Sequence, residues 1–193
     1  MSFTPNVVAL SGSLRRGSYN HKLAAVAAEA AEQAGANVTL IRLADYDMPL
    51  FNEDDEAEHG MPKPARAFKE LLIGSHGVII GSPEYNGSLS AALKNAIDWA
   101  SRPEPGEQPL VAFRGKVVGL LSASPGGLGG IRGLLHLRPL LGNIQMHVLP
   151  GQFCLAAAHE KFDDASALKD PGDREKAEAV GRAVVETARK LHG

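Results

Sequence analysis

Short apolar runs alternate along the chain with stretches in which apolar residues recur at helical spacing. The apolar runs lie at residues 7–10, 38–41, 78–80, 117–121 and 146–149, and they predict five short strands. Nearly continuous apolar strands are typical of parallel sheets that helices cover on both faces. The pattern therefore predicts a parallel sheet at the centre of the molecule.

Five other stretches predict helices. They are residues 20–34, 65–73, 90–101, 130–141 and 173–191. Gly35, Gly74 and Gly142 directly follow three of them, and glycine suits the left-handed residue that often ends a helix. The last helix has one apolar face, formed by Ala177, Val180, Val184, Ala188 and Leu191.

The alternation of strands and helices indicates an α/β fold. We expect residues 1–193 to form a single flavodoxin-like domain, a doubly wound five-stranded parallel sheet of order 2-1-3-4-5 with helices on both faces. Ligands of such sheets bind outside the carboxyl ends of the strands, where the strand order reverses. A site is therefore expected in the loops after the first, third and fourth strands.

Charge and cysteine content narrow the class of protein. The 193 residues include 20 basic and 22 acidic side chains, so the formal net charge of −2 gives no electrostatic case for nucleic acid or an anionic membrane as a partner. A single cysteine, Cys154, forms no disulfide within the chain. With no basic leader and no membrane-length apolar stretch, we expect a cytoplasmic protein.

The loop after the first strand, SGSLRRGSYN at residues 11–20, is unusually polar. It lacks the later glycines of a G-x-G-x-x-G dinucleotide loop and the G-K-[ST] of a P-loop. It offers serine hydroxyls, an amide, a guanidinium from Arg15 or Arg16, and backbone N–H groups at a helix start, which together suit a terminal phosphate. A polar turn capped by Ser18 is the simpler alternative, but a cap needs only one such residue.

Two further loops suit a ring. The loop GSPEYNGS at residues 81–88 combines the turn residues Pro83, Asn86 and Gly87 with the aromatic Tyr85, so its backbone amides suit a flat heterocycle. The loop SASPGGLGG at residues 122–130 has four glycines, which let the backbone approach a ligand closely. Three such loops at one sheet edge predict a site for a phosphate and a ring.

With these three loops the sequence resembles a known family, the NAD(P)H-dependent FMN reductases, which include bacterial chromate and quinone reductases and some azoreductases. The resemblance rests on GSLRRGSYN at residues 12–20, on PEYN at 83–86 with LKNAIDW at 93–99, and on the loop at 122–130. It extends from about residue 7 to about residue 149. Many relatives have proline where this chain has Ser90, and we expect a helix start to tolerate the exchange at the risk of a looser loop.

The resemblance implies where FMN binds. The first loop would hold the phosphate, the second would line the isoalloxazine and the ribityl chain, and the third would close the other side. The implied cofactor-binding residues are Ser13, Arg15, Ser18, Tyr19 and Asn20, then Pro83, Glu84, Tyr85 and Asn86, and finally Ser122, Ala123, Ser124 and Gly126.

The resemblance also implies an activity. NADPH or NADH would give hydride to FMN and leave, and two electrons would then pass in a ping-pong reaction to a small acceptor: a quinone, chromate, an azo compound or free flavin. No side chain need act as an acid or base, so no catalytic residue is assigned, and Glu84 is expected to contribute its backbone. Relatives are dimers or tetramers, so we expect a homodimer or homotetramer in which residues 45–52 and 99–109 meet a partner.

Two other functions fit the same fold. A flavodoxin-like electron carrier without NAD(P)H activity is disfavoured by the near-neutral charge, because such carriers are usually strongly acidic. A flavin-free nucleotide-binding module is the second alternative. The seven histidines are scattered, which predicts no metal site. The physiological acceptor stays open, as does the choice between NADH and NADPH, for which Arg16 or Arg102 would meet the 2′-phosphate.

Overall fold

The computed structural model describes residues 3–193 and confirms the predicted parallel sheet. Its strands are β1 (Asn6–Ser11), β2 (Asn37–Arg42), β3 (Gly77–Gly81), β6 (Val117–Ala123) and β7 (His147–Leu155). They lie in the order β2-β1-β3-β6-β7, and every neighbouring pair is parallel. Because β6 and β7 are the fourth and fifth strands of this sheet, the order is the expected 2-1-3-4-5.

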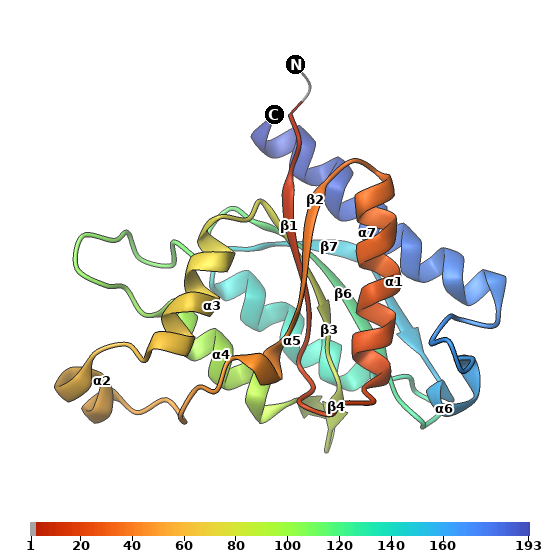
Figure 1. Ribbon diagram of the computed structural model, residues 1–193, viewed down its shortest axis with the longest axis horizontal. Coiled ribbons are helices and arrows are strands. Elements are labelled where there is room, and N and C mark those ends of the chain that lie inside the picture. The colour runs from red at the N-terminus through yellow and green to blue at the C-terminus, as the bar shows by residue number, and fades with distance from the viewer. Residues whose placement is uncertain (1–2) are drawn as a thin grey trace.

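Helices cover both faces of the sheet (Figure 1). The long helices are α1 (Tyr19–Gln33), α3 (Lys63–Ile73), α4 (Ala91–Ser101), α5 (Ile131–Asn143) and α7 (Pro171–His192). Side chains of α1 and α7 form one apolar core with the sheet, and side chains of α3, α4 and α5 form the other. No helix within residues 3–193 has the length and apolar character needed to cross a bilayer.

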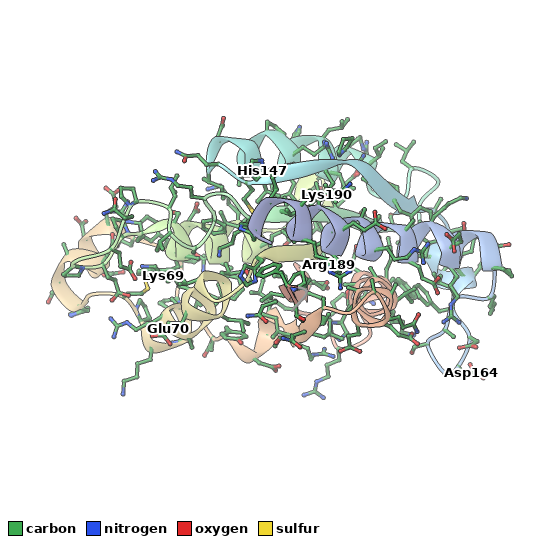
Figure 2. All side chains as sticks on the ribbon, turned by 90° about the horizontal axis from the view of Figure 1, so that it is seen from above. Lys69, Glu70, His147, Asp164, Arg189 and Lys190 are labelled. Atoms are coloured by element: carbon green, nitrogen blue, oxygen red, sulfur yellow. The ribbon has the colours of Figure 1, made fainter. Side chains whose placement is uncertain are left out.

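The terminal helix packs closely on α1. Ala177, Val180, Val184 and Ala188 are buried as predicted, whereas Leu191 is half exposed. A side chain at Gly181 would place its Cβ 2.0 Å from the carbonyl oxygen of Ala27, so only glycine fits this helix crossing. Arg189, labelled on α7 in Figure 2, donates to the carbonyl oxygens of Ala34 and Gly35 at 2.7 and 3.0 Å. These contacts join the end of α1 to the end of α7.

Two of the three predicted left-handed helix ends are wrong. Gly35 has the expected positive φ of 84°, but Gly74 is right-handed and Gly142 lies inside α5, which continues to Asn143. After α3, the Ser75 hydroxyl donates to the carbonyl oxygen of Leu72 and ends the helix without a left-handed residue. After α5, the left-handed residue is Gln145, with a φ of 68°.

The structure also contains elements that the apolar pattern does not predict. A 3-10 turn, η1 (Leu43–Asp45), and two short helices, α2 (Glu53–His59) and α6 (Ala158–Lys161), lie in the long connections. Helix α2 buries no side chain and begins with an Asn52 cap, so local hydrogen bonding forms it rather than apolar packing. Strand β7 continues past the predicted end at residue 149 through Pro150, which an edge strand accommodates at a break in its register with β6.

Candidate functional site

The three predicted loops meet at the carboxyl edge of the sheet, around a cavity of about 60 Å³. Each loop contributes residues to the lining of this cavity. The lining residues are Ser13, Arg15, Ser18, Tyr19 and Asn20, then Pro83, Glu84 and Tyr85, and then Ala123, Ser124 and Pro125. All the predicted site residues are therefore in its wall except Asn86, Ser122 and Gly126.

Serine hydroxyls of the first loop order the backbone and leave donors for a ligand. The Oγ atom of Ser13 accepts from the N–H of Arg15 at 3.3 Å, and the Oγ atom of Ser18 accepts from the N–H of His21 at 3.2 Å. Ser18 is thus the N-cap of α1, as the simpler interpretation of this loop requires. Since both oxygens act only as acceptors in these bonds, both hydroxyl hydrogens remain available to an anion beside the positive end of α1.

Asn20 joins the first loop to the third. Its Nδ2 atom donates to the carbonyl oxygen of Ala123 and its Oδ1 atom accepts from the N–H of Ala123, both at 2.8 Å. The side chain is buried, so these bonds are protected from water. Asn20 therefore holds the start of α1 against the end of β6, a role that the sequence did not reveal.

Ser90 joins the first loop to α4. Its hydroxyl donates to the carbonyl oxygen of Gly12 at 2.5 Å, and its Oγ atom accepts from the N–H of Leu93 at 3.1 Å as the N-cap of α4. A proline at this position would provide neither bond. The serine thus ties the two loops together instead of loosening them.

We expect Ser90→Ala to lower the free energy of unfolding by about 1 to 2 kcal/mol, because it removes a cap and a buried hydrogen bond. Urea unfolding monitored by circular dichroism measures this change. Ser90→Thr, which keeps the hydroxyl, is the matched control and should lose less than half as much. Equal losses in the two variants would show that the hydroxyl contributes nothing.

The second loop forms a hairpin. Strands β4 (Glu84–Tyr85) and β5 (Ser88–Leu89) pair antiparallel, and Asn86 and Gly87 connect them with φ values of 51° and 78°. Two successive left-handed residues are the signature of a type I′ turn, for which Asn-Gly is the preferred sequence. The turn accounts for Asn86, and the hairpin leaves Tyr85 half exposed at the cavity.

Arg132 is a residue of this region that sequence reasoning missed. Its Nε atom donates to the carboxylate of Glu84 at 2.7 Å, and the N–H of Gly133 donates to the same carboxylate at 3.2 Å. Burial alone would raise the pKa of Glu84, but these hydrogen bonds and the Arg132 charge outweigh it and lower that pKa. The bound, ionised carboxylate caps α5 and fixes the hairpin, so it is poorly placed to act as a general base.

The third loop has both a buried and an open part. Ser122 is fully buried and donates to the carbonyl oxygen of Ser82 at 2.7 Å, so its side chain serves the fold. Gly126 and Gly127 are exposed, and a Cβ would meet only the Ser124 Oγ atom at 3.6 Å in the first and nothing within 4 Å in the second. Neither has a left-handed φ, so the chain itself does not demand glycine at either position.

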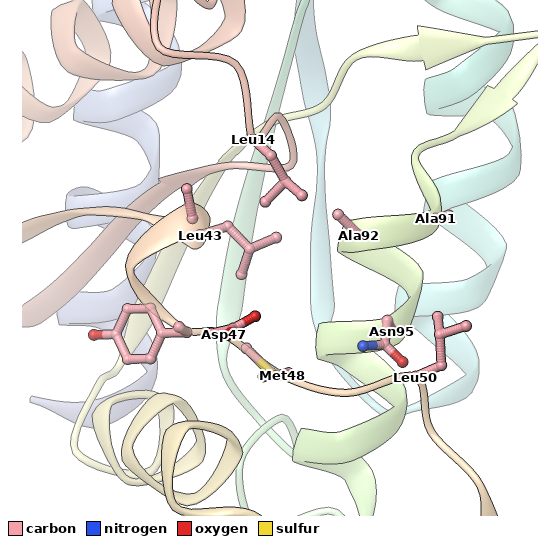
Figure 3. Close-up of a pocket in the computed structure, with 10 residues that line it drawn as sticks. Leu14, Leu43, Asp47, Met48, Leu50, Ala91, Ala92 and Asn95 are labelled. Atoms are coloured by element: carbon pink, nitrogen blue, oxygen red, sulfur yellow. The ribbon is translucent and has the colours of Figure 1, made fainter.

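A larger hollow of about 320 Å³ lies beside the cavity, between residues 43–50 and the first turns of α4 (Figure 3). Leu14 of the first loop and Leu50 line it, and they are 55% and 79% exposed. Trp99, which was expected near a partner, is instead buried and donates to the carbonyl oxygen of Pro49 at 2.8 Å. Because most of the side chains that line it are apolar, the hollow is an apolar surface next to the site.

Comparisons with known proteins identify the family of the chain. The family model for NADPH-dependent FMN reductase matches residues 5–160. An NAD(P)H-dependent FMN reductase of Pseudomonas aeruginosa is 38% identical over 195 residues, covering 100% of both chains. A quinone reductase of Escherichia coli K12 is 40% identical over 141 residues, which cover 73% of this chain and 71% of that protein.

Solved structures show the same architecture. The flavoenzyme NAD(P)H:(acceptor) oxidoreductase FerB of Paracoccus denitrificans superposes with a TM-score of 0.78 at 27% identity, covering 97% of this chain and 99% of that one. The family model matches most of the chain, and the similarity to a flavin reductase extends over its full length. The chain therefore belongs to the NADPH-dependent FMN reductase family and is an FMN-dependent NAD(P)H oxidoreductase.

Proposed function

We propose that FMN binds at the carboxyl edge of the sheet and links NAD(P)H to a quinone acceptor. The single observation that carries this proposal is the cavity that residues of all three loops line together. When bound, FMN supplies the two-electron chemistry of the reaction. The protein's own part is to bind and orient the cofactor, since the carboxylate of Glu84 is already engaged by Arg132.

The side chains present suit a flavin phosphate. Ser13, Arg15 and Ser18 line the cavity beside the N-terminus of α1, and the small volume of the cavity suits a phosphate group. The ring would then lie outside the cavity, between exposed Tyr85 and the open backbone at Gly126. A close approach of the ring to the backbone gives a reason for glycine where the fold supplies none.

The names of the relatives support a quinone as the acceptor. Proteins with 34% to 40% identity to this chain are named quinone reductases or NADPH:quinone oxidoreductases. Steady-state assays of the purified protein with benzoquinones, chromate, an azo dye and free FMN test this choice. We expect the highest kcat/KM for a quinone, and a higher value for any other acceptor would overturn the assignment.

The role of FMN has its own test. The purified protein should be yellow, and anaerobic NADPH should bleach the flavin absorbance. Bleaching that reverses when a quinone is added supports an oxidoreductase. A yellow protein that NAD(P)H fails to bleach would support the electron carrier, and a protein that does not take up FMN would refute both flavin functions.

We expect Arg15→Ala to weaken FMN binding by about 1 to 3 kcal/mol, because it removes a charged donor to the phosphate. Fluorescence titration of the apoprotein with FMN measures the affinity. Arg114→Ala is the control, since it removes the same charge from the turn before β6, at the opposite edge of the sheet. Unchanged affinity in Arg15→Ala would place the phosphate elsewhere.

We also propose that the chain acts as a homodimer or homotetramer in the cytoplasm. The exposed Leu14 and Leu50 beside the site support an interface there, and Leu50 belongs to the expected partner segment at residues 45–52. Light scattering after size exclusion tests the assembly. Leu50→Asp should shift the protein towards the monomer, and an unchanged mass would exclude this surface as the interface.

A further inference from the structure

A second polar groove lies next to the cavity of the first loop. It has a volume of about 450 Å³ and lies between the outer face of α1 and residues 165–168. We call it the basic groove, because its charged lining consists of Arg16, Lys22, Arg42, Arg174 and a single carboxylate, Glu29. The imidazole of His21 also lines it. Ser18 lines both the basic groove and the cavity, so the two lie next to each other at the start of α1.

The positive charges of the basic groove are largely uncompensated. Within residues 3–193, Arg16, Lys22 and Arg42 have no carboxylate within 4.0 Å. Arg174 pairs with Glu178 at 2.7 Å and lies 3.9 Å from Glu29. Glu29 is thus the one opposing charge in the groove, so the groove attracts an anion.

Other contacts restrain these cations. The Nη2 atom of Arg42 donates to the carbonyl oxygens of Arg15 and Arg16, both at 3.3 Å, and so holds the first loop over the end of β2. The Nζ atom of Lys22 lies 5.5 Å from the ring centroid of Phe162. Burial and then the Arg42 charge lower the pKa of His21, which leaves a neutral imidazole at pH 7 to accept or donate a hydrogen bond.

The structure also disfavours Arg102, the other residue that the sequence offered for the 2′-phosphate of NADPH. Arg102 lies at the end of α4, where its guanidinium binds Glu56 at 2.8 Å and lies 3.8 Å from Glu53. Those carboxylates neutralise it. Arg16, by contrast, is exposed in the basic groove with no ion pair in the described residues.

The position of the groove selects the kind of anion. The groove leads away from the phosphate end of the proposed FMN site, whereas the ring would lie near Tyr85 on the other side. A molecule that must touch the ring to exchange electrons therefore reaches this groove only with a remote, non-reacting part. The adenosine half of a dinucleotide is such a part, and NADPH differs from NADH by a phosphate on it.

We propose that the basic groove binds the 2′-phosphate of NADPH and makes NADPH the preferred hydride donor. The proposal rests on the proposed function, because it assumes FMN at the neighbouring cavity. Arginine and lysine bind a phosphate dianion through charge-assisted hydrogen bonds, and the 2′-hydroxyl of NADH offers no charge to match them. Binding energy from this remote group would then favour one nucleotide over the other.

The test removes two cations that touch neither the proposed FMN site nor the backbone of the loop. In the FMN-loaded Arg16→Ala/Lys22→Ala variant, kcat/KM for NADPH should fall by about 10- to 100-fold, the scale of one or two charge-assisted bonds, while kcat/KM for NADH changes less than about 2-fold. Lys63→Ala/Arg114→Ala, which removes two charges elsewhere, should leave both values unchanged.

Calorimetry gives a readout that does not depend on turnover. The wild-type holoprotein should bind 2′,5′-ADP more tightly than 5′-AMP, and the Arg16→Ala/Lys22→Ala variant should lose that difference. Equal binding of the two probes, or an unchanged NADPH to NADH ratio in an active variant, would overturn the groove proposal. Neither result would contradict the proposed function, which would fail if FMN-loaded wild type oxidised no NAD(P)H.

Discussion

Asn20→Ala should lower the free energy of unfolding by about 2 to 4 kcal/mol, the cost of leaving two buried backbone groups without partners. The variant removes both 2.8 Å bonds to Ala123 and with them the direct tie between α1 and β6. FMN affinity should fall as well, because the first and third loops would no longer be held together. Urea unfolding of the apoprotein and FMN titration measure the two effects separately.

Asn37→Ala is the matched control for this experiment. Asn37 also makes a side-chain bond between segments, to Asn6 at 3.1 Å, but at an exposed position where water replaces the lost partner. It should change stability by less than about 1 kcal/mol. Similar losses in Asn20→Ala and Asn37→Ala would mean that burial of the Ala123 contact contributes nothing.

The second large effect concerns Lys116, a buried lysine at the start of β6. Its Nζ atom donates to the carbonyl oxygens of Ile73 and Ser75 at 3.0 and 2.5 Å, and it forms no ion pair within residues 3–193. Burial without an opposite charge lowers the pKa of Lys116 from 10.5 to about 8. The folded protein therefore releases this proton at a lower pH than the unfolded chain does.

The sign of the effect follows from proton binding. Below pH 8 both states hold the proton and the folded state bears the full penalty of a buried charge. Between pH 8 and 10.5 the unfolded state binds more protons, so the contribution of Lys116 to stability rises with pH. From pH 7 to pH 10 the free energy of unfolding of the wild type, relative to Lys116→Met, should rise by about 2 to 3 kcal/mol.

Chemical denaturation of both proteins across this pH range checks the prediction, because groups that titrate equally in the two proteins cancel in the difference. Lys116→Arg supplies a second reference, since arginine keeps its charge throughout. The free energy of unfolding of the wild type should rise relative to that of both variants as the pH rises. A difference that stays constant from pH 7 to pH 10 would show that Lys116 keeps its proton in the folded state.

Hydrogen bonds between side chains and backbone atoms of this chain join the loops of the candidate site. Asn20 binds Ala123, Ser90 binds Gly12, and Ser122 binds Ser82, each by hydrogen bonds to backbone atoms. Such bonds restrain the loops relative to one another, and restraint of a binding loop lowers the entropic cost of binding.

The sequence by itself determined the sheet, its strand order and the three loops of the site. Its apolar runs form the strands of the sheet, and clusters of glycine, serine and asparagine mark the loops that follow them. Local pattern and chain connectivity therefore suffice to predict the sheet, its strand order and these loops. The Asn-Gly turn at residues 86 and 87 likewise follows from local backbone preference. Helix α2 was not predicted, because it buries no side chain and so shows no apolar periodicity.

Only the tertiary structure decided which polar side chains face the cavity and which support it. Ser122 looks like a ligand in the sequence, yet it lies outside the cavity and its partner Ser82 is 40 residues away in the chain. Asn20 lines the cavity and also binds Ala123, which is 103 residues away. The ion pair of Arg132 with Glu84 and the neutralisation of Arg102 by Glu56 are similarly distant in sequence. A polar side chain carries the same letter whether its partner is a ligand or a remote backbone group, and only packing distinguishes the two.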